Sequence, residues 1–249
     1  MKKKIILIFV TILSIGLLVG CTNPKKDYRN FIEAEEIKVV ATTSLIADMV
    51  RNIGGNKVFV HQLMKPGVDP HSYIPTKLDI DYLLSADVVI FSGMHLEAQT
   101  SEALRKVANR DVLVIEAANI LVQKHENNNE DGVTLLSWTD EDHEGHEHGD
   151  LLYDPHFWFN VDYWIIVSRY ITNELQKLYP QHQSYFELRY QSYLTELNAL
   201  NTYLESRVNE IPVEKRVLLT AHDAFGYFGE RYGFSVNAVL GVSTEDEAS

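Results

Sequence analysis

The sequence predicts an α/β fold made of two lobes with one long helix between them, and three observations carry this prediction. First, short apolar runs alternate with helical patterns over residues 37–115, which is the rhythm of a parallel sheet. Second, another strand, helix and strand pattern begins at residue 216. Third, apolar residues at spacings of four and three predict a helix of roughly 25 residues, about 37 Å long. This apolar stripe consists of Phe186, Tyr190, Tyr193, Leu197, Leu200, Leu204 and Val208.

The strands of the first lobe are expected where β-branched and apolar residues run together. They cover residues 37–41, 57–64, 87–91 and 112–115. The helices between them cover residues 45–53, 77–84 and 97–107, and Ser44 and Thr76 are the expected N-caps of the first two. In open parallel sheets, ligands bind beyond the carboxyl ends of the strands, so a binding site is expected at that edge.

The rest of the chain divides at a long interruption. Residues 116–150 break the alternating rhythm and are too many for a compact connection, which indicates a functional or disordered segment. A helix is expected at 161–178, where Pro180 ends it, and the long helix follows. The second lobe then begins with a strand at 216–220, a helix at 224–232 that Gly233 ends, and a strand at 234–240.

The N-terminus predicts export and a lipid anchor. Three lysines at positions 2–4 precede an apolar run from Ile5 to Leu18, which has the length of a signal peptide and is shorter than a membrane span. Cys21, the only cysteine, follows this run directly, as in a bacterial lipobox where the thiol carries diacylglycerol. The alternative is an ordinary secretory signal. A single cysteine also excludes an internal disulfide and a thiolate metal site.

The composition supports a globular, acidic protein. Hydrophobic residues make up 45% of the chain, and the formal net charge is -13. Removing the signal peptide, which holds three lysines and no acidic residue, would change this charge to -16. Such a surface repels nucleic acid and suits cations, although acidity on its own is equally consistent with simple solubility.

Three histidines share one context, because each lies in a stiff turn or just past a strand, beside an aspartate. They are His71 in Asp-Pro-His-Ser-Tyr, His156 in Asp-Pro-His-Phe-Trp-Phe and His222 in Thr-Ala-His-Asp. Neutral imidazole is the commonest protein ligand for zinc, and a nearby aspartate can hold the second ring nitrogen. The alternative for His156 is a loop histidine that packs on Trp158. The sequence therefore predicts a metal site of three histidines.

The other histidines have simpler interpretations. His95 lies near a strand end and is a weaker candidate for the same site, whereas His61, His125 and His182 are expected to be packed or exposed. An acidic tract holds His143, His146 and His148 and cannot form a core. We interpret it as an auxiliary loop that collects metal weakly, because ordering its ligands costs entropy. The alternative is a solvated acidic loop.

Several motifs resemble one known family. Gly-Val-Asp-Pro-His-Ser-Tyr, Gly-Met-His-Leu-Glu, Asp-Pro-His-Phe-Trp-Phe and Thr-Ala-His-Asp-Ala-Phe-Gly-Tyr-Phe occur in the expected order within residues 37–249. They are similar to the metal-binding lipoproteins of bacterial ABC importers for zinc and manganese, the cluster A-I or TroA-like solute-binding proteins. The resemblance implies a rigid linking helix and an interlobe cleft with His71, His156 and His222 as ligands. It places a fourth, carboxylate ligand beyond Ser249, so we expect an incomplete second lobe.

The resemblance also implies a division of the chain into functional parts. The expected parts are a signal peptide at 1–20, a tether at 21–36, a metal-binding lobe at 37–182 with a His-rich acidic loop at about 125–150, a linking helix at 183–210 and the start of the second lobe at 211–249.

The function that the resemblance implies is capture of zinc or manganese outside the cell and delivery to an ABC permease. We expect zinc ahead of manganese, because three imidazoles suit tetrahedral zinc and manganese prefers more oxygen ligands. The protein is expected to be a monomer that the lipid on Cys21 holds at the cell membrane, with no catalytic activity. Two alternatives are a zinc-dependent hydrolase, since three histidines and a water form a hydrolytic arrangement, and a surface adhesin.

Overall fold

The computed structural model describes residues 24–110, 112–138 and 152–240, and it divides the chain into two compact units. The first unit covers residues 1–35 and contains helix α2 (Pro24–Ile32), so residues 24–32 of the expected tether are helical. The second unit covers residues 36–249 and holds all three sheets of the described part of the chain. In the described ranges, no helix combines the length and the apolar character that crossing a membrane requires.

A four-stranded parallel sheet forms the centre of the first lobe, as predicted. Its strands are β1 (Ile37–Ala41), β2 (Val58–Gln62), β3 (Val88–Phe91) and β4 (Leu113–Glu116), in the order β2-β1-β3-β4. Val39 and Val40 of β1 are fully buried, because side chains on both faces of the sheet meet helices. β1 and β3 lie side by side at the centre of the sheet, so their carboxyl ends open toward the same edge.

Three helices connect these strands, and their caps follow from local sequence. Helix α3 (Ser44–Gly54) has Thr43 as its N-cap, one residue before the expected Ser44, because the Thr43 hydroxyl accepts from the Ile46 N–H. Thr76 caps α4 (Lys77–Ser85) in a full capping box with Asp79, as predicted. The expected helix at 97–107 is wrong at its start, since a 3-10 turn (Ala98–Thr100) precedes α5 (Ser101–Ala108).

The segment that interrupts the rhythm contains more regular structure than predicted. Helix α6 (Asn119–Glu126) follows β4, although its three successive apolar residues at 120–122 show no helical spacing. A 3-10 turn (Glu130–Gly132) and two short antiparallel strands, β5 (Ser137–Trp138) and β6 (Leu152–Tyr153), complete it. Another 3-10 turn (Phe157–Phe159) then leads into the next helix. The three histidines at 143–148 lie outside the described residues, as does Cys21.

Two long helices run beside each other, and the second of them carries the predicted apolar stripe. Helix α7 (Val161–Leu178) begins at the Asn160 N-cap, and a 3-10 turn (Pro180–His182) joins it to the 27-residue α8 (Gln183–Asn209). The Trp164 indole donates to the Tyr193 hydroxyl at 2.9 Å, so a polar bond ties the helices inside the core. The stripe is wrong at Leu200, which is 44% exposed, although Val208 farther along the helix is buried.

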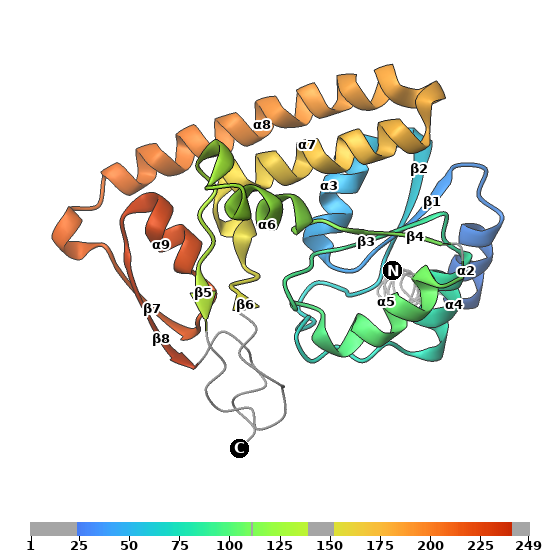
Figure 1. The fold of residues 1–249 in the computed structure, drawn as a ribbon, viewed down its shortest axis with the longest axis horizontal. Helices are drawn as coiled ribbons and strands as arrows, with labels where there is room; N and C mark the ends of the chain where they lie inside the picture. The colour runs from blue at the N-terminus through green and yellow to red at the C-terminus, as the bar shows by residue number, and fades with distance from the viewer. Residues whose placement is uncertain (1–23, 111, 139–151, 241–249) are drawn as a thin grey trace, which may run out of the picture. The chain divides into compact units, whose positions relative to one another are not determined.

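The second lobe is the unit formed by β7 (Val217–His222), α9 (Gly226–Tyr232) and β8 (Ser235–Leu240), which follow a 3-10 turn (Val213–Lys215). The two strands pair in parallel, as predicted, and Gly233 ends α9 with a φ of 73°. On α9, Arg231 donates to Asp162 on α7 and to Glu205 on α8. The second lobe therefore rests on the C-terminal half of α8 (Figure 1).

Candidate metal centre

Three histidine side chains from separate parts of the chain meet at one point. His71 lies in the loop between β2 and α4, His156 immediately precedes the 3-10 turn at 157–159, and His222 is the last residue of β7. The Nε2 atom of His156 lies 3.3 Å from that of His71 and 3.2 Å from that of His222. In tetrahedral zinc sites with Zn–N bonds of about 2.0–2.1 Å, two nitrogen ligands are about 3.3 Å apart. The spacing of the three imidazoles therefore fits a shared ion.

Burial keeps the His71 imidazole uncharged and available as a ligand. His71 and His156 are only 6% and 3% exposed, and His222 is half-buried. Burial, together with repulsion from His156, lowers the pKa of His71 to about 4. The neutral ring keeps a nitrogen lone pair at neutral pH, which a metal ion requires.

Asp154 determines which nitrogen of His156 faces the site. Its Oδ1 atom accepts from the His156 backbone N–H at 2.9 Å and from the ring Nδ1 at 2.7 Å. The proton is therefore assigned to Nδ1, and the Nε2 lone pair points to the other two histidines. Asp154 itself is 5% exposed, so this hydrogen bond is shielded from water.

Both Asp-Pro-His triplets form the same local turn. Asp69 accepts from the His71 N–H at 3.0 Å, as Asp154 does from the His156 N–H, and each aspartate reaches a backbone group two residues later. The intervening proline restricts the backbone of each triplet. The Thr100 hydroxyl also donates to the Tyr73 carbonyl at 3.0 Å, which joins the His71 loop to the start of α5. Local sequence thus orients two of the three imidazoles.

A buried carboxylate that the sequence analysis missed stabilises the sheet edge. Glu97 is 3% exposed and accepts from the Thr42 hydroxyl at 2.6 Å, after β1, and from the Ser92 and Gly93 N–H groups after β3. Burial raises the pKa of Glu97, whereas these donors favour its charged form. In the sequence, Glu97 ends the Gly-Met-His-Leu-Glu motif. In the structure, it follows a turn at 93–95 in which three successive residues have positive φ. Glu97 therefore holds together the ends of two central strands.

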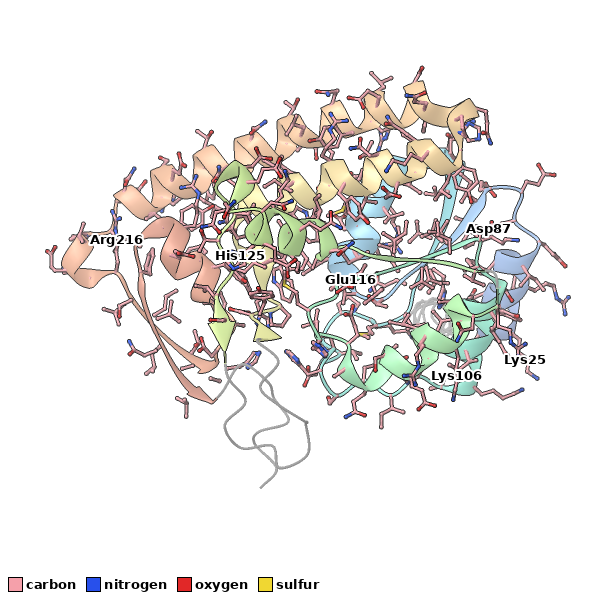
Figure 2. All side chains as sticks on the ribbon, in the orientation of Figure 1. Lys25, Asp87, Lys106, Glu116, His125 and Arg216 are labelled. Atoms are coloured by element: carbon pink, nitrogen blue, oxygen red, sulfur yellow. The ribbon has the colours of Figure 1, made fainter. Side chains whose placement is uncertain are left out.

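The remaining histidines lie elsewhere. His95 is exposed, His61 stacks on Tyr82 at a ring distance of 3.4 Å, and the His182 ring lies 6.0 Å from that of Phe186. His125, labelled at the end of α6 in Figure 2, accepts from the Leu135 N–H through Nδ1. Among the described residues, only the three converging histidines form a group of His, Cys, Asp or Glu that could share an ion.

Comparison with known proteins identifies one family. Residues 39–249 match the family described as zinc-uptake complex component A, periplasmic. The zinc-binding protein TroA of Treponema pallidum is 35% identical over 96% of this chain and 70% of its own length. Its solved structure superposes with a TM-score of 0.74, covering 86% of this chain and 70% of that one, at 37% identity.

Two relatives that are named for manganese are also similar to this chain. The manganese-binding lipoprotein MntA of Bacillus subtilis is 38% identical over 86% of this chain, which spans 63% of that protein. The manganese ABC transporter substrate-binding lipoprotein PsaA of Streptococcus mitis is 30% identical over 99% of this chain and 75% of its own length. The fold class predicted from the sequence is confirmed by these likenesses and by the two lobes described above.

Proposed function

This chain belongs to the zinc-uptake complex component A family, and we propose that it captures zinc or manganese ions and delivers them to an ABC permease for import. The observation that carries the proposal is the convergence of three imidazoles, two from the first lobe and one from the second, with Nε2 spacings of 3.2 and 3.3 Å. An ion that binds all three is held by both lobes at once. Ion binding therefore favours one relative position of the two lobes, and a permease can recognise the lobes in that position.

The ligands that we propose are His71, His156 and His222, with a fourth position for water or a carboxylate. Three nitrogen ligands favour zinc over manganese, because zinc forms the stronger bonds to imidazole and accepts tetrahedral geometry. Relatives are named for zinc or for manganese, so both ions belong to the proposed range of cargo. His143, His146 and His148 form the proposed auxiliary loop, which collects ions without holding them tightly.

We assign the protein to the outer face of the cell membrane, as a monomer tethered through a lipid on Cys21. Relatives are named as lipoproteins, and Cys21 follows an apolar N-terminal run as the chain's single cysteine. The proposal includes no reaction at the metal. Asp154, the carboxylate next to His156, already accepts two hydrogen bonds through Oδ1 and is held as a structural acceptor.

The test is metal binding by the purified chain and its variants. Zinc and manganese affinities are measured by competition with a chromophoric chelator for the wild type, His222→Ala and His95→Ala. We expect the wild type to bind zinc tightly and His222→Ala to lose this binding. His95 is exposed, so His95→Ala should bind zinc as tightly as the wild type. Unchanged zinc affinity in His222→Ala, or no binding by the wild type, would contradict the proposed site.

A further inference from the structure

The start of α9 lies directly on the residue that orients His156. Tyr227, in the first turn of α9, is fully buried, and its hydroxyl donates to the Asp154 carbonyl at 3.0 Å. The same hydroxyl accepts from the Leu136 N–H at 3.3 Å. Asp154 is therefore held at both ends, by Tyr227 through its carbonyl and by its own carboxylate on His156.

The neighbour of Tyr227 shows how close this packing is. A Cβ atom on Gly226 would meet the Leu136 Cδ1 atom at 2.8 Å and the Asp154 Oδ2 atom at 3.1 Å. A side chain at position 226 would therefore crowd the Leu136 and Asp154 side chains, which must shift to admit it. The aromatic rings of Phe225 and Phe159 add an apolar contact at a centroid distance of 4.3 Å.

The short segment that carries Tyr227 also carries His222. His222 ends β7, and the Ala224 N–H donates to its carbonyl at 3.0 Å, in the turn that leads to α9. Five positions separate His222 from Tyr227, so movement of one with respect to Asp154 carries the other with it. The hydrogen bond from Tyr227 to Asp154 thus connects the segment that carries His222 to the residue that orients His156.

We propose that Tyr227 is a positioning residue, which sets the separation of His222 from His156 by holding α9 on the Asp154 carbonyl. This inference rests on the proposed function, since it concerns the same ion. Loss of the hydroxyl leaves the Asp154 carbonyl and the Leu136 N–H without this partner, and α9 relaxes away from them. His222 then lies farther from the ion position, although no metal ligand has changed.

Tyr163 provides a matched control for Tyr227. Its hydroxyl accepts from the Thr134 N–H at 2.9 Å and donates to the Thr134 carbonyl at 2.8 Å, in the same segment that contains Leu136. The Tyr163 ring packs edge-on against Tyr227 at 5.6 Å, but Tyr163 belongs to α7 in the first lobe. Tyr163→Phe therefore removes a comparable buried hydroxyl without removing the bond from α9 to Asp154.

The experiment compares the wild type, Tyr227→Phe and Tyr163→Phe as full chains. Three quantities are measured: the melting temperature of the metal-free protein, the zinc affinity and dissociation rate by chelator competition, and the visible absorption spectrum of the Co²⁺-loaded protein. We expect both variants to melt at similarly lowered temperatures. Only Tyr227→Phe should weaken zinc binding, by about 10-fold through faster dissociation, and alter the Co²⁺ spectrum.

Several outcomes would overturn the inference. Equal zinc affinities and Co²⁺ spectra in the two variants would show that the Tyr227 hydroxyl is only a structural bond. If Tyr227→Phe does not fold, Gly226→Ala decides, because its new Cβ presses on the Leu136 and Asp154 side chains while the Tyr227 hydroxyl is retained. Weakened zinc binding by Gly226→Ala supports the inference, and unchanged binding rejects it. Failure of the wild type to bind zinc would instead reject the proposed function, which the His222→Ala comparison tests separately.

Discussion

Replacing Asp154 with alanine removes both hydrogen bonds that hold His156 without changing any proposed ligand. One bond goes from the His156 backbone N–H and the other from Nδ1, with lengths of 2.9 and 2.7 Å to the same Oδ1 atom. A hydrogen bond to a charged group contributes about 1.5–3 kcal/mol, and loss of an outer-shell partner typically lowers metal affinity by about 10–100-fold. Because each factor of ten is about 1.4 kcal/mol, loss of the Nδ1 bond, which orients the ring, is enough to account for a decrease of this size. We therefore expect Asp154→Ala to weaken zinc binding by about 10–100-fold.

Asp154→Asn separates the charge of this residue from its geometry. An asparagine oxygen can still accept from Nδ1 but carries no negative charge, so its zinc affinity should fall between those of the wild type and Asp154→Ala. The assay is chelator competition at neutral pH, with the melting temperature of each metal-free variant as the measure of folding. An alanine variant that folds and keeps wild-type zinc affinity would refute the role of Asp154 in presenting His156.

Three further predictions follow from the site and the sheet. The pKa of His71 is about 4 in the folded protein and about 6.5 in the unfolded chain, so the stability of the metal-free protein should fall as the pH drops from 6.5 to 4 and the unfolded chain gains a proton. The free energy of unfolding of His71→Gln, measured by urea denaturation, should depend less on pH over this range. Identical pH profiles for the variant and the wild type would contradict this prediction. Gly93→Ala should lower the free energy of unfolding by more than about 1 kcal/mol, because the φ of Gly93 is 93° and the new Cβ meets Glu116. Gly67→Ala is the control: its φ is 84° but the space around it is open, so urea denaturation should show a smaller decrease in the free energy of unfolding. Deletion of residues 140–149 should leave zinc affinity unchanged in the same chelator assay, and loss of tight binding would count against a collecting role.

The parts of the fold that the sequence could predict depend on local patterns. The four strands of the first lobe are apolar runs, and the Thr76 capping box is complete within four residues. Both Asp-Pro-His triplets are local as well, since each aspartate bonds to a group two residues later. The register error of one residue at the Thr43 cap arose because threonine and serine are adjacent and both can cap.

The parts that could not be predicted depend on contacts between distant residues. Glu97 bonds to Thr42 across 55 positions, and Tyr227 bonds to Asp154 across 73. Nothing in the local spacing of these residues distinguishes them from a helix-start glutamate or a packed tyrosine. Helix α6 was missed for a related reason, since Leu121 is its single fully buried residue and the helix shows no apolar face. Their roles follow only from the folded arrangement.

The length of α8 bears on how an ion could leave such a site. At 27 residues the helix is a rod of about 40 Å, which packs against α3 near one end and bonds to α9 near the other. Long helices flex gently as a whole, and a uniform bend of roughly 5° over about 40 Å shifts the far end by about 2 Å. That shift is comparable to the length of a metal–nitrogen bond, which is about 2 Å. If a membrane partner bends α8 at its far end, the distance between His222 and the ion would therefore increase without a large opening of the two lobes.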